Sequence, residues 1–89
     1  MPEELAGCLK SFTATQEAAL AAILKEDRPY EVITVLADEA MTMPEVIIDE
    51  INEITYSFLN ELLIEQDEEN LSVIEPYQTM LRKAMGMEE

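Results

Sequence analysis

The chain has 89 residues and carries 20 carboxylate side chains against five Lys and Arg, which gives a formal net charge of −15. Contact with a phosphate backbone or an anionic membrane surface needs clustered cations, so this charge argues against nucleic acid and membranes as partners. The chain has no His, which excludes His-based catalysis, and its single cysteine, Cys8, excludes an intramolecular disulfide.

Apolar residues make up 48% of the chain, enough for the modest core that one domain of this size can bury. No segment approaches the ~18 apolar residues that a membrane span requires. The N-terminus lacks the basic region and apolar run of a signal peptide. We therefore expect a single acidic domain over residues 1–89, located in the cytoplasm.

The first residues place apolar side chains at helical spacing, but Gly7 weakens a helix there. We interpret 1–12 as a frayed helix or an ordered arm. Thr13 and Gln16 then fit a capping box, in which each side chain bonds the other residue's backbone. The first firm helix is accordingly predicted over 13–26.

Two prolines divide the next part of the chain into two helices, because proline disfavours a helical residue before it and fits the first helical position itself. One helix is predicted from Pro29 to about Met41, with the Met41 side chain in the core. The other is predicted from Pro44 to about Leu59. Asn60 tolerates the left-handed conformation of a C-terminal cap and is predicted to end it.

The helix predicted over 44–59 has two contrasting faces. Its apolar face comprises Ile47, Ile48, Ile51, Ile54, Thr55 and Phe58, and it continues to Leu62. Glu45, Asp49 and Glu53 lie four residues apart on the opposite face. No Lys or Arg occurs in 29–81 to neutralise them. Such a row is more often a solvated helix face than a site, and its functional interpretation is an interaction surface.

Some polar side chains are predicted to have structural roles. Asn52 lies on the margin of the apolar face, and we expect its amide to bond a backbone group of the following hairpin or of a neighbouring loop. Tyr30, Tyr56 and Tyr77 are expected to pack their rings against the core with their hydroxyls outward.

Residues 62–66 and 71–75 are rich in β-forming side chains and flank the acidic tetrapeptide 67–70, which predicts a short β-hairpin. A last helix follows, with Gly86 ending it and 87–89 forming a mobile tail. The fold class is therefore mainly α: a small domain of four to five helices with one short hairpin, in an order like that of a winged helix. A winged helix often binds DNA, but an acidic third helix would repel the phosphates.

The sequence offers little for catalysis. Cys8 has no His to activate it, and the two glycines cannot form a phosphate-binding loop. Hard divalent cations prefer clustered oxygen ligands, which the acidic stretch 67–70 could supply. The spacing after Asp67 fails the calcium-loop pattern, however, so a solvated hairpin tip is the favoured interpretation. No enzyme activity and no cofactor are expected, with a divalent cation as the alternative.

The run IIDEINEITYSFLNELLIEQDEENLSVIEPY, residues 47–77, resembles the TerB-C domain, which follows the TerB domain in tellurite-resistance-associated bacterial proteins. The resemblance rests on Ile51-Asn52-Glu53 in an amphipathic helix, then Leu63-Ile64-Glu65, an acidic turn and a hydrophobic segment leading to Tyr77. The helix over 36–41 also fits. Asn60-Glu61 stands where members often have Gly and an acidic residue.

The resemblance implies a role in bacterial stress-response assemblies, with acidic residues that chelate metal. Transferred to this chain, it implicates Asp49, Glu53, Glu65 and Glu68 as candidate metal ligands.

The function expected from the sequence is a non-catalytic acidic interaction module of a larger, tellurite-resistance-like bacterial protein. Its partner would be a protein with a basic surface or a neighbouring domain of the same chain. The first alternative is a divalent-metal-binding domain that uses clustered carboxylates. The second is a winged-helix DNA-binding domain, which the charge disfavours.

Overall fold

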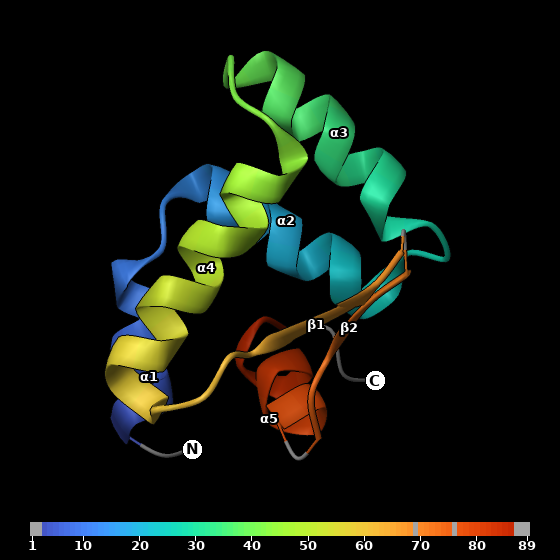
Figure 1. Cartoon of the computed structure of the whole chain (residues 1–89). Coiled ribbons are helices and arrows are strands. Elements are labelled where there is room, and N and C mark those ends of the chain that lie inside the picture. The colour runs from blue at the N-terminus through green and yellow to red at the C-terminus, as the bar shows by residue number, and fades with distance from the viewer. Residues whose placement is uncertain (1–2, 69, 76, 87–89) are drawn as a thin grey trace.

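The computed structural model of the chain describes residues 3–68, 70–75 and 77–86. Within these residues it contains five helices and one two-stranded antiparallel hairpin (Figure 1). In chain order the elements are α1 (Glu3–Ser11), α2 (Ala14–Lys25), α3 (Pro29–Glu39), α4 (Pro44–Leu59), β1 (Ile64–Asp67), β2 (Asn70–Val73) and α5 (Tyr77–Ala84). The predicted mainly α domain with one short hairpin is confirmed, whereas the tail expected at 87–89 lies outside the described residues.

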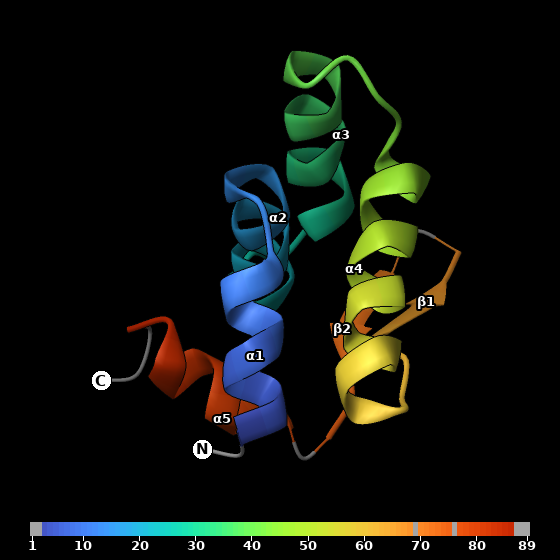
Figure 2. The ribbon, with the colours of Figure 1, turned by 90° about the vertical axis from the view of Figure 1, so that its left-hand side faces the viewer.

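Residues 3–11, expected to form a frayed helix or an ordered arm, form the packed helix α1. Leu5 and Cys8 on this helix are fully buried, and α1 runs alongside α4 (Figure 2). A Cβ atom at Gly7 would lie 2.7 Å from the Cε1 atom of Phe58. Gly7 therefore permits the close approach of α1 to the last turn of α4, where a larger residue would displace the ring.

The ends of α2 and α4 follow the predicted local chemistry. The Thr13 hydroxyl accepts a hydrogen bond from the Gln16 backbone N–H at 3.2 Å, and the Thr13 N–H donates to the Gln16 side chain at 3.0 Å. This reciprocal pair is the predicted capping box. Asn60 ends α4 in the left-handed conformation, with φ of 59°, and its N–H donates to the Tyr56 carbonyl.

The placement of Met41 in the core is wrong. Helix α3 ends at Glu39, and Met41 adopts a left-handed φ of 59°. The Met41 N–H bonds the Asp38 carbonyl and the Thr42 N–H bonds the Ala37 carbonyl, which is the hydrogen-bond pattern of a Schellman cap. This reversal turns the Met41 side chain off the helical face and leaves it 93% exposed.

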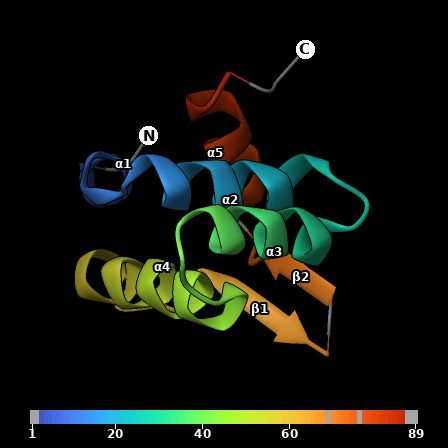
Figure 3. The same cartoon turned by 90° about the horizontal axis from the view of Figure 1, so that it is seen from above.

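The elements enclose one core between layers. Figure 3 shows α1 and α2 between α5 on one side and α4 with the hairpin on the other. Strand β2 packs against α2 and α3, and β1 packs against α4. The core side chains contributed by the strands are Ile64, Leu71 and Val73. The Arg82 guanidinium of α5 donates to the Leu24 carbonyl near the end of α2 at 2.7 Å, which ties the last helix to this core.

The hairpin is displaced from its predicted bounds. Ile64 pairs with Val73 and Asp67 pairs with Asn70, so both strands extend further toward the tip than the sequence predicts. Leu62, expected at the start of the first strand, precedes β1 and is 56% exposed. No helix in the described part of the chain is long and apolar enough to cross a membrane.

Candidate functional site

The acidic side chains lie at the surface. Every Asp and Glu among residues 3–68, 70–75 and 77–86 is exposed, including the predicted row of Glu45, Asp49 and Glu53 along α4. Within the same residues the one ion pair joins Arg28 to Glu31 at 3.8 Å, and both side chains are mostly exposed. Exposed ion pairs of this kind contribute little to the stability of the fold. The described part of the chain thus leaves most of its negative charge unneutralised.

Two tyrosine hydroxyls donate hydrogen bonds to carboxylates on this surface. The Tyr30 hydroxyl on α3 donates a hydrogen bond to the Glu45 carboxylate at the start of α4. This bond, with help from a backbone hydrogen bond, lowers the pKa of Glu45 below its usual value. The Tyr77 hydroxyl donates to Glu61 at 2.8 Å, and the pKa of Tyr77 is raised by that bond.

The tyrosine rings are placed as predicted in two of three cases. Tyr30 and Tyr77 pack against the core and direct their hydroxyls to surface carboxylates. Tyr56, by contrast, is 55% exposed and does not pack against the core. Its position near the C-terminal end of α4 places it beside the polar margin of the helix instead.

The predicted structural role of Asn52 is confirmed. Its Nδ2 donates to the Ile64 carbonyl at 3.2 Å, while its Oδ1 accepts from the Ile64 N–H at 2.8 Å. The amide therefore bonds β1 as a neighbouring strand would. One helical turn later the buried Thr55 hydroxyl accepts a hydrogen bond from the Leu63 N–H at 3.3 Å. The helical period places Thr55 on the apolar face, and nothing in the local sequence signals this bond to a residue eight positions away.

A hollow of about 400 Å³ lies between α4 and the segment that leads into β1. Its lining consists of Asp49, Asn52, Glu53, Tyr56 and Leu62, and we call it the α4 groove. Two predicted interaction residues, Asp49 and Glu53, belong to it, whereas Glu45 does not. The groove could not be predicted from the sequence, because the helical period places Leu62 on the inward face of α4.

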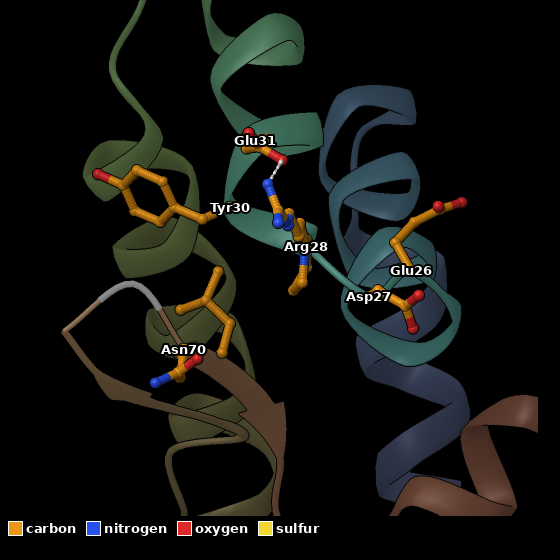
Figure 4. Close-up of a pocket in the computed structure, with 8 residues that line it drawn as sticks. Glu26, Asp27, Arg28, Tyr30, Glu31 and Asn70 are labelled. Atoms are coloured by element: carbon orange, nitrogen blue, oxygen red, sulfur yellow. Dashed lines mark ion pairs between the residues drawn. The ribbon is translucent and has the colours of Figure 1, made fainter.

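A second hollow, of about 420 Å³, lies where the link between α2 and α3 approaches the hairpin (Figure 4). Its lining consists of Glu26, Asp27, Arg28, Pro29, Tyr30, Glu31, Asn70 and Leu71. In Figure 4 the Arg28 and Glu31 side chains point toward one another, and Asn70 approaches from the hairpin. These residues come from two distant segments of the chain, so no local sequence pattern could have grouped them.

The structure spreads the candidate metal ligands over three places. Asp49 and Glu53 lie on α4, Glu65 lies on β1 opposite Ser72, and Glu68 occupies the hairpin turn with φ of 59°. Among the described residues, no three Asp, Glu or Cys side chains form a group that could hold a metal ion. The geometry thus joins Asp49 with Glu53 alone, as neighbours in the α4 groove.

Comparisons with known proteins give one family. Neither curated proteins nor solved structures yield a match to this chain. A scan against protein-family models matches residues 2–82 to the TerB-C domain. This match extends beyond the resemblance, which covers about the last two-thirds of the chain, since it also includes α1 and α2. The chain therefore belongs to the TerB-C domain family.

Proposed function

We propose that this TerB-C domain is a non-catalytic interaction module that binds a basic protein surface. The observation that carries the proposal is the exposed, unneutralised row of carboxylates on α4, formed by Glu45, Asp49 and Glu53. Charge of one sign on one face attracts a partner of opposite charge and suppresses wrong partners. The partner is a separate protein or a neighbouring domain of a longer chain.

The chemistry of the titratable groups supports a non-catalytic role. Catalytic acids and bases need pKa values close to the working pH, which burial and neighbouring charges provide. Here the exposed carboxyl of Glu45 has a pKa shifted downward, away from neutrality. Burial raises the pKa of the Cys8 thiol, which makes it a poor nucleophile.

Family membership supports the biological setting of the proposal. The resemblance to this family implies a domain that follows the TerB domain in tellurite-resistance-associated bacterial proteins. We propose that this domain serves a stress-response protein of that kind by holding a basic component of the assembly through α4.

Binding assays on charge variants test the proposal. The wild-type domain and the Glu45→Gln, Asp49→Asn, Glu53→Gln triple variant are used to capture partners from a tellurite-challenged bacterium, and captured proteins are then purified and titrated. We expect the triple variant to bind about tenfold or more weakly, since each exposed charge contact contributes up to about 1 kcal/mol. Binding should also weaken as salt screens the charges.

A matched control removes three exposed carboxylates elsewhere, through Glu17→Gln, Glu26→Gln and Asp27→Asn. This variant should bind within about twofold of the wild type, because none of these three carboxylates lies on α4 and salt screens exposed charges outside the contact. Equal loss in both triple variants would show that only overall charge matters. Salt-independent binding would contradict the electrostatic basis of the proposal.

Metal binding is the alternative that the family resemblance supplies. The separation of Asp49 and Glu53 from Glu65 and Glu68 gives it no geometric support among the described residues. Calorimetric titration with Ca²⁺, Mg²⁺ and Mn²⁺ decides between the two functions, and we expect flat titrations. A site of micromolar affinity that also raises the melting temperature would establish metal binding instead.

DNA binding is tested in the same way by a gel shift at low salt. We expect no saturable complex, because α4 would bring its carboxylates against the phosphates.

A further inference from the structure

We propose that the α4 groove binds a short basic segment of the partner, in which a Lys or Arg alternates with an apolar residue. The stem of the basic side chain would lie on Tyr56 and Leu62, and its charged end would reach Asp49 and Glu53. This inference rests on the proposed function and deepens it, because it names the site and the chemistry of the segment that fills it.

The groove offers an apolar floor that the chain leaves uncovered. Tyr56 and Leu62 are 55% and 56% exposed, although both are large apolar side chains next to a hollow of about 400 Å³. Binding sites for peptide side chains are concave and largely apolar, with a few polar groups that fix orientation. The α4 groove combines the apolar side chains of Tyr56 and Leu62 with the polar side chains of Asp49, Asn52 and Glu53, and the two carboxylates are its orienting groups.

The groove is held open by fixed walls. Both amide atoms of Asn52 are engaged by the Ile64 backbone, and the Leu63 N–H bonds the buried Thr55 hydroxyl. These bonds fix the segment that contains Leu62 against α4 before any partner arrives. A site formed in advance avoids part of the entropy cost of binding.

The charge of the groove is not balanced by this chain. Within residues 3–68, 70–75 and 77–86, no hydrogen bond or ion pair engages the carboxylate of Asp49 or Glu53. The five cations of the chain are Lys10, Lys25, Arg28, Arg82 and Lys83, and none of them lies on α4 or the hairpin. The lining of the groove contains no Lys or Arg, so a cation from a partner would find both carboxylates unoccupied.

Arginine and lysine fit both surfaces of the groove at once. Their methylene stems cover apolar surface while their charged ends stay in solvent. Arginine also stacks on aromatic rings and bonds carboxylates with two parallel hydrogen bonds. Tyr56 beside the Asp49 and Glu53 pair offers both interactions. The hollow of Figure 4 is a weaker candidate, because Arg28 already brings a cation to it.

Peptides of defined sequence test the inference by nuclear magnetic resonance on the ¹⁵N-labelled domain at low salt. The probe is acetyl-Leu-Arg-Leu-Arg-amide, and the matched peptide is acetyl-Leu-Gln-Leu-Gln-amide. We expect saturable shifts centred on the backbone amides of the α4 groove with the arginine peptide, and binding about tenfold or more weaker with the glutamine peptide. No saturable shift with the arginine peptide would overturn the inference.

Two pairs of variants separate the groove from general attraction. Asp49→Asn with Glu53→Gln should weaken the arginine peptide about tenfold, whereas Asp38→Asn with Glu39→Gln removes the same charge from α3 and should change it less than about twofold. The spectrum of each variant, recorded without peptide, confirms that it is folded.

The apolar floor is tested in parallel. Leu62→Ser should weaken binding several-fold, while Val35→Ser, at a position 59% exposed on α3, should leave it unchanged. Equal weakening by both charge variants, or indifference to Leu62→Ser, would overturn the groove and leave the acidic module of the preceding proposal intact. The broader proposal is contradicted by a different result: the α4 triple variant would bind the captured partner as tightly as the wild type does.

Discussion

Met41 occupies a backbone conformation that residues with a Cβ atom avoid. Three of the described residues that follow helices have positive φ, namely Met41 and Asn60 at 59° and Gly86 at 73°. Glycine and asparagine are the usual residues at such positions, and methionine is not. The ends at Asn60 and Gly86 could therefore be predicted from the sequence. The end at Met41 could not, because nothing in a methionine side chain signals a left-handed turn.

Replacing Met41 with glycine should stabilise the domain. Met41→Gly relieves a left-handed strain of about 1–2 kcal/mol and removes no packing, since the side chain is 93% exposed. The extra freedom of glycine in the unfolded chain offsets part of this, so we expect a net gain of about 0.5–1 kcal/mol in urea denaturation. Val35→Gly is the control, because Val35 is also exposed but lies in the interior of helix α3, where glycine is unfavourable, and it should give a loss instead of a gain.

The hydrogen bond between Tyr30 and Glu45 makes a small, pH-dependent contribution. The folded-state pKa of Glu45 lies below its usual value of 4.5, so this bond stabilises the fold above that pH and its contribution is lost as the pH falls through the folded pKa. Tyr30→Phe should shift the titration midpoint of the Glu45 carboxyl upward in a ¹³C-detected experiment. Tyr56→Phe, which leaves that bond in place, should not shift it.

At the scale of elements, the Asn52 side chain joins α4 to the first residue of the hairpin. The Asn52 amide bonds both backbone groups of Ile64, so Asn52→Ala leaves a strand N–H and C=O without these partners. We expect a loss of about 1–3 kcal/mol in urea denaturation, together with faster hydrogen exchange at the Ile64 amide.

Ser57→Ala, at an exposed position on the same helix, should cost less than about 0.5 kcal/mol. Asn52→Asp should recover only part of the loss, because it restores the acceptor for the Ile64 N–H without the donor for its carbonyl. A fully stable Asn52→Ala variant would show that packing alone places the hairpin.

The bounds of the helices could be predicted from the sequence better than the way in which the helices pack against one another. Thr13, Pro29 and Pro44 mark helix starts through local chemistry, and the structure follows them. The packing of α1 could not be foreseen, since the reason for Gly7 is the ring of Phe58 on a distant segment. The helical period, extended past Asn60, predicts an inward Leu62. The α4 groove therefore could not be predicted from the sequence.

At the scale of the whole molecule, the exposed carboxylates repel one another. A net charge of −15 on 89 residues destabilises the compact state relative to the extended chain, and added salt screens that repulsion. We expect the melting temperature to rise by about 4–8 °C between 10 mM and 0.5 M NaCl, which corresponds to roughly 1 kcal/mol for a domain of this size.

The control for this salt effect is pH. Near the sequence isoelectric point of about 4.1 the net charge vanishes, and the response to NaCl should vanish with it. An equal response at both pH values would assign the effect to salt acting on apolar burial rather than on charge. The acidity that underlies this behaviour is evident in the sequence, whereas the α4 groove is visible only once α4 is placed beside the segment that leads into β1.

Because Cys8 is buried, the reactivity of its thiol reports local unfolding of the domain. The thiol is 0% exposed on α1, it is the one sulfhydryl of the chain, and its raised pKa keeps it protonated at neutral pH. A disulfide reagent such as Ellman's can therefore modify it only when α1 detaches from the rest of the fold. The labelling rate, compared with that of the urea-unfolded chain, measures how often the N-terminal helix undocks, without any engineered probe.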